Sequence, residues 1–443
     1  MGKVKMKSNI YQLQKKYINK ILTKVKNKTT KKWGKQLIFK KMTLNHKKLL
    51  ERLKNKEKIR VVFLVLYKTM WKVDTIFKKM QDDPLFEPII LVCPDKSYGE
   101  EQMFKDMDET FQYFKDLKYN TFYSYKKEEN RWLLLEELNP DIIFFTRPHN
   151  LTKEEYYEKA YLNYLTCYVP YHHEVGDYGD NISQYNQNFH NAMWKIFVSH
   201  TCSKNTFEKY SVCKGKNVLD TGYPMMEELL IKKEDKNYTN IWKHKDYRIK
   251  IIFAPHHTID SEELPYSNFL DYHEKFRELA IELKDKVIWS FKPHPLLRLK
   301  LNNHQYWGKE KTDEYFSFWQ ESEFSQLDEG DYVDLFLSSD AMIHDSGSFL
   351  AEYLYLQKPV MYIKRDKNNH FNQFGQDILK VINVAKNFDD IRNFVYKLIE
   401  NKDNLINPNQ NSFFNTKIGI YFKDKYPSDR IIENIKNSIK GLK

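Results

Sequence analysis

The chain has 443 residues, 41% of them hydrophobic and 15% aromatic, which is enough for the cores of two or three domains. No run approaches the roughly 18 apolar residues of a membrane span. The N-terminal stretch lacks the apolar segment expected of a secretory signal, and the four cysteines form no CxxC pair. We therefore expect a cytoplasmic protein without a metal site or other cofactor.

The net charge of +12 is concentrated at one end, because the first 60 residues hold 21 Lys and Arg against two Glu and the remainder is mildly acidic. This distribution argues against nucleic-acid binding over the whole protein. In residues 1–58, apolar residues recur at helical spacing between lysines, first over 8–28 and then from Lys31 to Lys54. The pattern predicts a basic helical arm on the cytoplasmic face of an anionic membrane. A helical hairpin packed on the body and an RNA-binding arm are the alternatives, but no RNA-binding signature accompanies the arm.

Residues 59–235 alternate strand and helix patterns. The run Ile59–Leu66 is almost entirely apolar, which is typical of a central parallel strand buried on both faces. The alternation predicts a doubly wound α/β domain for the acceptor. We expect strands at 59–66, 86–92, 121–124, 141–145, 167–171 and 195–199, and helices at 73–80, 102–117, 132–138 and 203–210.

A cluster of polar residues follows the predicted strand 167–171. It contains His172, His173 and Glu174, and Gly176 comes two residues later. A general base is well placed at such a strand end, and either histidine is a candidate, with Glu174 to orient it. The alternative is a polar loop in which the histidines have structural partners.

The alternation restarts in residues 236–425, where we expect the nucleotide donor to bind. A strand at 248–253 leads to His256, and a strand at 287–291 leads to Lys292-Pro293-His294-Pro295, with Arg298 just beyond. The two prolines restrain the backbone of His294. Cationic and N–H groups at this edge suit a diphosphate leaving group.

The stretch from 332 to 363 predicts strand, turn, helix and strand. Asp345-Ser346-Gly347-Ser348 lies between the strand Ala341–Ile343 and the helix Phe349–Leu356. Unpaired N–H groups and two hydroxyls at this helix start favour a phosphate, and Glu352, one turn deeper, suits ribose hydroxyls. The alternative is that Asp345 and Ser346 only cap the helix.

Together these patterns predict a GT-B-like architecture. Two Rossmann-like doubly wound domains face a cleft, a basic helical arm precedes them, and a helix within 426–443 packs back across the domains.

Three motifs occur in a characteristic order: Ala254-Pro255, Lys292-Pro293-His294-Pro295, and Asp345-Ser346-Gly347-Ser348 with Glu352. Over roughly residues 248–365 they resemble the CDP-glycerol glycerophosphotransferase family, which includes teichoic-acid and capsule polymerases. The resemblance implies that His294, Ser346 and Ser348 lie at the diphosphate of a CDP-alditol and that an N-terminal His-Gly motif supplies the base. This chain departs from the family where Gly347 separates the serines, and where 172–176 replaces a compact His-Gly-Thr.

We therefore predict transfer of glycerol phosphate or ribitol phosphate from a CDP-alditol to a lipid-linked or glycan acceptor. The donor would contact His256, Lys292, Arg298 and the Asp345–Ser348 segment. Because the Asp-Ser-Gly motif also resembles sugar-nucleotide GT-B enzymes and UDP-GlcNAc 2-epimerases, a glycosyltransferase for surface polysaccharide is the alternative. A non-catalytic nucleotide-binding or RNA-binding protein is a third.

Overall fold

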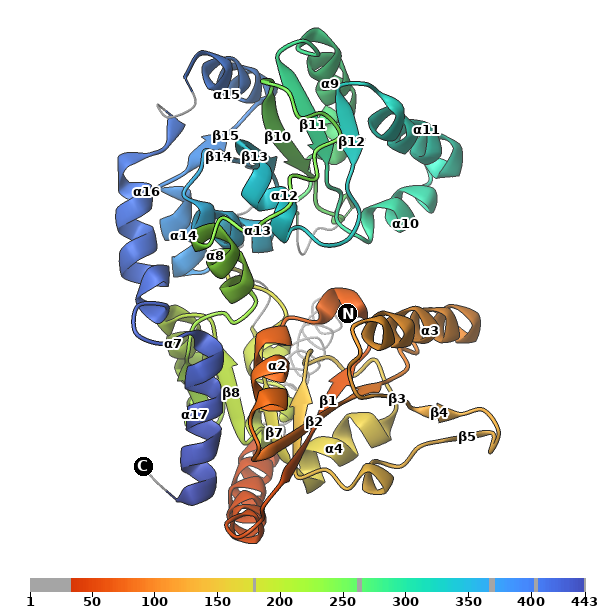
Figure 1. Ribbon diagram of the computed structural model, residues 1–443, viewed down its shortest axis with the longest axis vertical. Coiled ribbons are helices and arrows are strands. Elements are labelled where there is room, and N and C mark those ends of the chain that lie inside the picture. The colour runs from red at the N-terminus through yellow and green to blue at the C-terminus, as the bar shows by residue number, and fades with distance from the viewer. Residues whose placement is uncertain (1–32, 178–180, 261–264, 366–370, 402–404, 442–443) are drawn as a thin grey trace, which may run out of the picture.

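The computed structural model describes residues 33–177, 181–260, 265–365, 371–401 and 405–441. They form two α/β lobes, one above the other in Figure 1, each built on one large sheet. Every strand pairing within these two sheets is parallel. The predicted pair of doubly wound domains is confirmed.

The N-terminal sheet has seven strands. Their order is β3-β2-β1-β6-β7-β8-β9, so the chain winds outward from β1 in both directions. The apolar run at 59–66 forms the central strand, as expected. The strands are β1 (Ile59–Val65), β2 (Phe86–Val92), β3 (Thr121–Tyr123), β6 (Ile142–Phe145), β7 (Leu165–Tyr168), β8 (Lys195–Val198) and β9 (Val218–Asp220).

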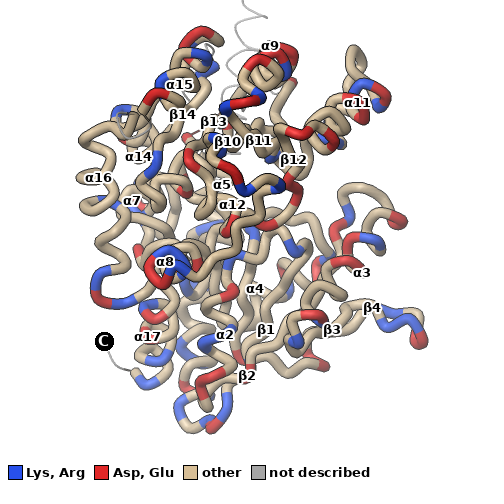
Figure 2. The backbone as a smooth tube through the Cα atoms, turned by 45° about the horizontal axis from the view of Figure 1, so that its top comes forward, with Lys and Arg blue, Asp and Glu red and all other residues tan. Residues whose placement is uncertain are grey.

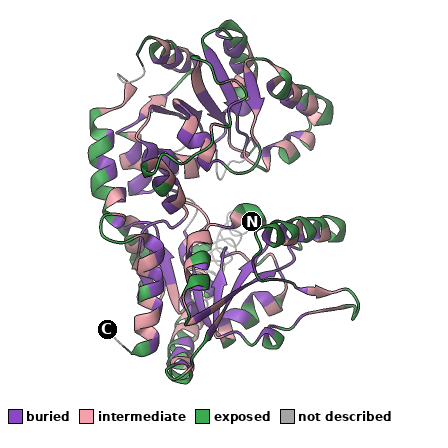
Figure 3. Ribbon diagram, in the orientation of Figure 1, coloured by how far each residue is buried: buried purple, intermediate pink, exposed green. Residues whose placement is uncertain are grey.

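Alternate residues of β1 enter two different cores, because successive side chains of a strand point to opposite faces. Val61 and Phe63 pack with α2, α3 and α17, while Val62 and Leu64 pack with α4, α6, α7 and the helical residues 33–53. Figure 3 shows the strands of both lobes as buried. The helices and 3₁₀ turns of this half are η1 (Lys68–Met70), α2 (Asp74–Asp82), α3 (Glu100–Asp116), η2 (Leu135–Leu138), η3 (Glu154–Tyr156), α4 (Glu158–Asn163), α5 (Ile182–Tyr185), α6 (Asn188–Ala192), α7 (Thr201–Tyr210) and α17 (Pro427–Lys440).

The C-terminal sheet has six strands in the order β12-β11-β10-β13-β14-β15. If these strands are renumbered along the chain, the order is 3-2-1-4-5-6, which is that of a dinucleotide-binding Rossmann fold. The strands are β10 (Ile249–Ala254), β11 (Val287–Phe291), β12 (Ser325–Leu327), β13 (Ala341–His344), β14 (Val360–Ile363) and β15 (Asn383–Ala385).

The helices of the C-terminal lobe cover both faces of its sheet. Helix α8 belongs to this lobe by packing, because its apolar side chains enter the C-terminal core, although it precedes the domain boundary expected after residue 235. The helical elements are α8 (Met226–Glu234), α9 (Phe269–Glu282), α10 (Leu297–Asn302), α11 (Gly308–Glu321), α12 (Val333–Ser338), α13 (Gly347–Glu352), η4 (Tyr353–Leu356), α14 (Gln373–Leu379), α15 (Phe388–Asn401), α16 (Pro408–Phe413), the π turn η6 (Phe414–Ile418) and η7 (Gly419–Tyr421).

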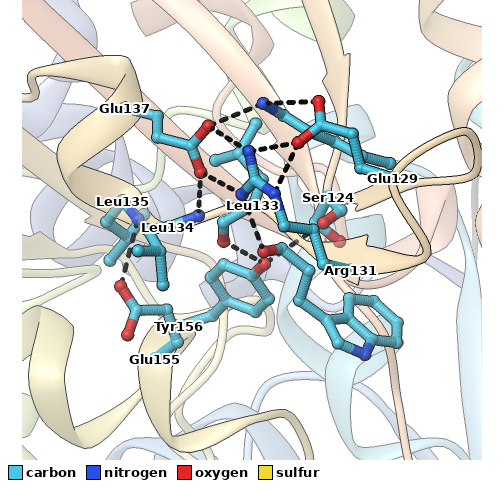
Figure 4. Close-up of polar contacts among 11 residues, drawn as sticks. Ser124, Glu129, Arg131, Leu133, Leu134, Leu135, Glu137, Glu155 and Tyr156 are labelled. Carbon is cyan, nitrogen blue, oxygen red and sulfur yellow. Dashed lines mark hydrogen bonds and ion pairs between the residues drawn. The ribbon is translucent and has the colours of Figure 1, made fainter.

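The helix predicted over 132–138 is wrong. A hairpin, β4 (Tyr125–Lys126) paired with β5 (Arg131–Trp132), occupies its start, and only η2 is helical. The hairpin projects from the lobe and carries both signs of charge (Figure 2). Arg131 donates to Glu129 and Glu137 (Figure 4). Lys126 also donates to Glu137. The residues of this ion network lie close together in the sequence. The helical spacing of the leucines nevertheless predicts a helix where the structure has a hairpin.

Residues 33–53 are helical, which confirms the second predicted helix of the arm, whereas 8–28 lies outside the described residues. This helix, red in Figure 1, packs Met42 and Leu53 against the N-terminal lobe on the side away from the C-terminal lobe. Helix α17 returns to the N-terminal lobe, where Ile431 and Ile435 are fully buried. No helix among the described residues is both long and apolar enough to cross a bilayer.

Candidate active site

The first candidate site lies at the centre of the C-terminal sheet. Strands β10 and β13 are neighbours there, although β11 and β12 come between them in sequence, and Ala254 pairs with His344. Ligands of open α/β sheets bind in the crevice at such a switch point, beyond the carboxyl ends of the strands. His256 and Asp345 follow these two strand ends directly.

Asp345 holds the loops of this crevice together. Its Oδ1 accepts the backbone N–H of His256 and its Oδ2 accepts that of Asn268, both at 2.6 Å. Burial raises the pKa of Asp345 to about 7, against the lowering effect of these bonds. Because both carboxylate oxygens are engaged in loop bonds, Asp345 organises the site through the backbone rather than presenting a free carboxylate to a ligand.

Helix α13 starts at Gly347, two residues before the predicted start, and the second half of the predicted helix is the 3₁₀ turn η4. Ser346 is its N-cap residue, but its side chain makes no capping bond. A Cβ atom at Gly347 would lie 3.4 Å from the ring of Tyr266, which is ordinary van der Waals contact, so the packing does not require glycine here. Ser348 is half-buried one residue further on. Neither Asp345 nor Ser346 therefore caps the helix with its side chain.

Glu352 is deeply buried and already has a partner. Its Oε2 accepts the hydroxyl of Tyr332 at 2.6 Å, and burial raises its pKa, opposed by the charge of Lys72. Lys72 belongs to the N-terminal lobe, and its Nζ lies 5.2 Å from the centre of the Tyr332 ring. The carboxylate expected at a ribose thus lies in a contact between the lobes.

Three histidines gather at the ends of β10 and β11. The ring centres of His257 and His294 are 4.1 Å apart, those of His256 and His294 5.0 Å, and one ring nitrogen of each lies within 4.8 Å of the others. Burial is the main cause that lowers the pKa of all three. They are therefore neutral imidazoles at neutral pH.

The hydrogen bonds of His294 fix its tautomer. Nδ1 accepts the backbone N–H of Leu296 at 3.1 Å, and an amide N–H can only donate, so the proton of the neutral ring is on Nε2. A metal ligand needs a lone pair on the exposed nitrogen, which this Nε2 does not offer. The ring instead presents an N–H donor, which suits an anion better than a cation.

The two cations expected beside His294 have partners within the lobe. Lys292 Nζ donates to the carbonyls of Asp328 and Gly330 at 3.2 and 2.7 Å, and burial lowers its pKa to about 8. Arg298 lies over the ring of Phe316 at 4.6 Å, and Asp313 and Glu329 are 3.8 and 3.9 Å away. The structure does not bring Arg298 to the histidine cluster through any described contact.

The second candidate site follows β7, which ends at Tyr168, three residues before the predicted end. In the loop, Nδ1 of His172 lies 3.0 Å from the carbonyl oxygen of His173. A carbonyl only accepts, so Nδ1 carries the proton and Nε2 keeps its lone pair. Burial lowers the pKa of His172, so this ring is neutral and has the tautomer of a general base.

His173 has a different environment. It is only 2% exposed, its Nε2 is 3.1 Å from the hydroxyl of Tyr355 in the C-terminal lobe, and its ring stacks near those of His200 and Phe374. Its contacts join the two lobes. Of the two candidate bases, His172 is the one that lines a pocket.

Glu174 does not orient either histidine through a described bond. Its Oε2 accepts the N–H and the hydroxyl of Ser199, both at 3.3 Å, and burial raises its pKa to about 7. Its backbone carbonyl accepts the side-chain amide of Asn372 at 2.6 Å, and Gly176 forms an antiparallel bridge with Phe371. This loop is therefore attached to the C-terminal lobe.

A small, open pocket lies beside His172, with a cavity volume of about 20 Å³. The sequence already indicates His149, because Arg147-Pro148-His149 comes just past the carboxyl end of the predicted strand 141–145, where ligands bind in open α/β sheets. It assigns no role to Tyr171, or to His257 and Tyr332 elsewhere in the cleft. His257 could have been found from its position just beyond a strand end. Tyr332 gives no such signal, because its role depends on Glu352, 20 residues away. The pocket is lined by Pro148, His149, Tyr168, Pro170, Tyr171, His172, Glu174, Gln184 and Tyr185.

Comparison with known proteins places this fold and these motifs in context. Two curated relatives are the teichoic acid poly(ribitol-phosphate) polymerase of Bacillus spizizenii, 26% identical over 247 residues, and the teichoic acid ribitol-phosphate polymerase TarL of Staphylococcus aureus, 24% identical over 262 residues. These matches include 50% and 56% of this chain. They include only 37% and 42% of the relatives, so the chain spans about two fifths of the length of the proteins that it matches.

Solved structures share the fold at low sequence identity. The wall teichoic acid polymerase TagF, as a variant soaked with CDPG, superposes with a TM-score of 0.54 at 15% identity over 93% of this chain and 98% of the other. The MnaA–UDP structure from S. aureus gives 0.54 at 14% identity over 87% and 97%, and a putative UDP-N-acetylglucosamine 2-epimerase from Listeria monocytogenes gives 0.53 at 15% over 88% and 98%. These similarities confirm the predicted two-domain architecture.

A family model matches the loop after β7, the whole C-terminal lobe and most of α17. It is the model of the CDP-glycerol:poly(glycerophosphate) glycerophosphotransferases, and the match extends over residues 169–437. Because this match includes more than half of the sequence and both candidate site edges, the chain belongs to the CDP-glycerol:poly(glycerophosphate) glycerophosphotransferase family.

Proposed function

We propose that this chain transfers glycerol phosphate or ribitol phosphate from a CDP-alditol to a hydroxyl of a lipid-linked or glycan acceptor, in the synthesis of a teichoic-acid or capsule polymer. The observation that carries the proposal is the pair of opposite tautomers. His172 presents a lone pair and His294 presents an N–H, each at the carboxyl edge of a different sheet.

The chemistry requires one base and one donor to the diphosphate. The acceptor hydroxyl attacks the β-phosphorus, a new P–O bond forms, and the hydroxyl proton passes to Nε2 of His172. The bond between the β-phosphorus and the bridging oxygen breaks, and CMP leaves with the electron pair. The Nε2–H of His294 donates to the diphosphate oxygens, where negative charge increases in the transition state.

The remaining residues of the C-terminal edge have supporting roles. The N–H groups of Ser346, Gly347 and Ser348 and the hydroxyl of Ser348 belong to the start of α13, just beyond the carboxyl end of β13, and suit the diphosphate. Asp345 positions His256 through the backbone bond described above. Oε2 of Glu352 accepts the hydroxyl of Tyr332, so a ribose hydroxyl would bind to Oε1.

The test is transfer by the purified full chain. We would supply CDP-glycerol, CDP-ribitol, UDP-GlcNAc and GDP-mannose, each with a polyol-phosphate acceptor, and identify the released nucleotide by chromatography. Release of CMP, reduced by about 10²–10³-fold in His294→Ala, is the expected result. Near-normal turnover by His294→Ala would refute the role of this histidine, and release of UDP or GDP would identify a glycosyltransferase instead.

We also propose that residues 1–58 hold the enzyme on the cytoplasmic face of an anionic membrane. In the described part of this arm, Trp33, Leu37 and Leu44 are 65%, 65% and 63% exposed on the helix 33–53, and lysines lie between them. Exposed apolar residues among basic ones suit an anionic lipid surface.

Sedimentation with phosphatidylglycerol vesicles tests this anchoring. The variant Leu37→Glu with Leu44→Glu is expected to remain in the supernatant. Tyr306→Glu, a change at a 77% exposed residue of the other lobe, is the matched control and is expected to sediment like the unmodified chain. Equal sedimentation of all three proteins would contradict the proposal.

A further inference from the structure

The N-terminal sheet has a switch point of its own. Strands β1 and β6 are neighbours at its centre, although β2 and β3 come between them in sequence. Arg147 and His149 follow the carboxyl end of β6, and Asp95 follows that of β2. By position, this edge is equivalent to the one that carries His256 and Asp345 in the other lobe.

Arg147 is buried at this edge with few partners. It is 9% exposed, its Nη1 donates to Asp95 Oδ2 at 3.4 Å, and its Nε has no hydrogen-bond partner among the described residues. A guanidinium has five N–H donors in a planar fork. A buried N–H without an acceptor is costly, and a phosphate or carboxylate oxygen is the kind of group that this fork binds best.

Arg147 comes directly before Pro148 and His149, which line the pocket beside His172. Two side chains on the pocket wall, His149 and Tyr171, can donate to an anion. Burial, then the charge of Arg147 and then that of His172 lower the pKa of His149 to about 4, and the charge of Arg147 also opposes the burial effect on Tyr171. The guanidinium therefore acts electrostatically on both rings of the pocket wall.

Two carboxyl groups face this region. Asp95 is paired with Arg147, and Glu174, which lines the pocket, has its pKa raised to about 7 by burial. The balance of formal charge is thus close to neutral, and the imidazoles are unprotonated. An anion bound here would stabilise the imidazolium of His149 and raise its pKa, which gives a specific spectroscopic signature.

We propose that this pocket binds a phosphate group, with Arg147 and His149 as its ligands. The phosphate belongs to the acceptor, as a phosphomonoester or phosphodiester next to the hydroxyl that reacts. That identification rests on the proposed function, because it uses the position of the pocket beside His172. The binding of phosphate itself does not depend on transfer activity, and the donor diphosphate is assigned to the edge of the other sheet.

The experiment observes the histidine rings of the full chain in the absence of donor. With ¹³C-labelled histidine, glycerol 3-phosphate is expected to raise the pKa of His149 by about one unit or more, whereas glycerol at the same concentration leaves it unchanged. Inorganic phosphate is a third probe: binding weaker than that of glycerol 3-phosphate supports an acceptor subsite. Binding of inorganic phosphate alone would overturn the acceptor assignment. His149→Gln identifies the resonance.

Variants test the role of Arg147. Arg147→Gln is expected to weaken the binding of glycerol 3-phosphate at least about tenfold, because one hydrogen bond to a charged group is lost. Because this change leaves Asp95 without its partner, Asp95→Asn with Arg147→Gln is measured as well. Arg131→Gln on the exposed hairpin is the matched control and is expected to bind normally.

The failures of the two proposals are distinguishable. An unchanged pKa of His149 at saturating glycerol 3-phosphate would overturn the phosphate site even if CMP release is observed. An equal shift of this pKa in Asp95→Asn with Arg147→Gln would overturn it as well. A response at His149 that depends on Arg147, without any transfer from a CDP-alditol, would overturn the proposed function and leave the phosphate site standing.

Discussion

The two lobes place histidines at equivalent edges but bond them in opposite ways. In the N-terminal lobe, Nδ1 of His172 donates to a carbonyl, and in the C-terminal lobe, Nδ1 of His294 accepts from an amide. Burial lowers the pKa of both rings. The difference teaches that the backbone group at Nδ1, rather than burial or residue type, decides whether a neutral histidine serves as base or as donor.

The largest expected effect comes from substitutions that test this difference between base and donor directly. Glutamine carries an N–H that can reach the position of Nε2 but cannot take up a proton. His294→Gln should therefore keep at least about tenfold more activity than His294→Ala, whereas His172→Gln should lose about 10²–10⁴-fold in kcat.

Measurement of CMP release from the CDP-alditol donor at saturation checks both positions. His173→Gln is the control for the first loop, since its contact with Tyr355 predicts a loss of stability. A larger loss of kcat in stably folded His173→Gln than in His172→Gln would contradict the choice of base.

The buried carboxyl groups of the two edges give the next effect. The native pKa of Glu174 is raised to about 7, above its value of about 4.3 in the unfolded chain. The native state therefore binds more protons between these values, so this group makes stability fall as pH rises from about 4 to about 7. Glu174→Gln removes this pH dependence. The free energy of unfolding of the variant, relative to that of the unmodified chain, should therefore increase by on the order of 3 kcal/mol from pH 4 to pH 8. Urea unfolding at several pH values measures it, and parallel pH profiles would disprove the sign.

Asp345 sharpens the contrast with Glu174. The two bonds from Ser199 to Glu174 go to one oxygen, Oε2, and a glutamine oxygen can accept both, while the hydroxyl of Ser203, which also bonds to this carboxylate, can accept from the glutamine NH₂. The bonds of Asp345 use both oxygens, so Asn at this position leaves one buried N–H facing an NH₂ group. At pH 8 both substitutions remove a buried charge, because burial raises the pKa of both carboxyl groups to about 7. Asp345→Asn loses about 2 kcal/mol of this gain through the unmatched N–H and should therefore stabilise the protein less than Glu174→Gln does. Equal gains in chemical denaturation would argue against this account.

The smallest expected effect concerns a positioning residue. Leu296 has φ −84° and ψ −6° in a turn closed by the bond from the Leu297 N–H to the His294 carbonyl at 2.8 Å, and its N–H holds Nδ1 of His294. Leu296→Pro removes this donor and also disfavours the turn, because proline is disfavoured at this turn position. It should lower kcat about tenfold, somewhat more than the net contribution of about 1 kcal/mol for one hydrogen bond.

Leu296→Ala keeps the N–H and is expected to retain normal activity. The ¹⁵N shifts of His294 should report mixed tautomers only in the proline variant. A single tautomer in both variants would show that another contact fixes the ring.

Sequence patterns predict the sheets well because a strand buried on both faces must be apolar throughout, as in β1. They also locate His172, His294 and Asp345, since parallel strands collect their carboxyl ends at one edge. They fail where a contact joins distant segments. The partners of Glu352 and Arg298, Tyr332 and Phe316, depend on packing between separate helices and loops, and the hairpin at 125–132 follows from side-chain ion pairs that no periodicity reports.

The return of α17 to the N-terminal lobe has a consequence for synthesis. Ile431 and Ile435 complete a core whose central strand is made at residues 59–65. During translation this core lacks a helix until more than 360 further residues have left the ribosome, and its apolar face needs temporary cover during that interval. The lobe encoded first is therefore the lobe that finishes folding last.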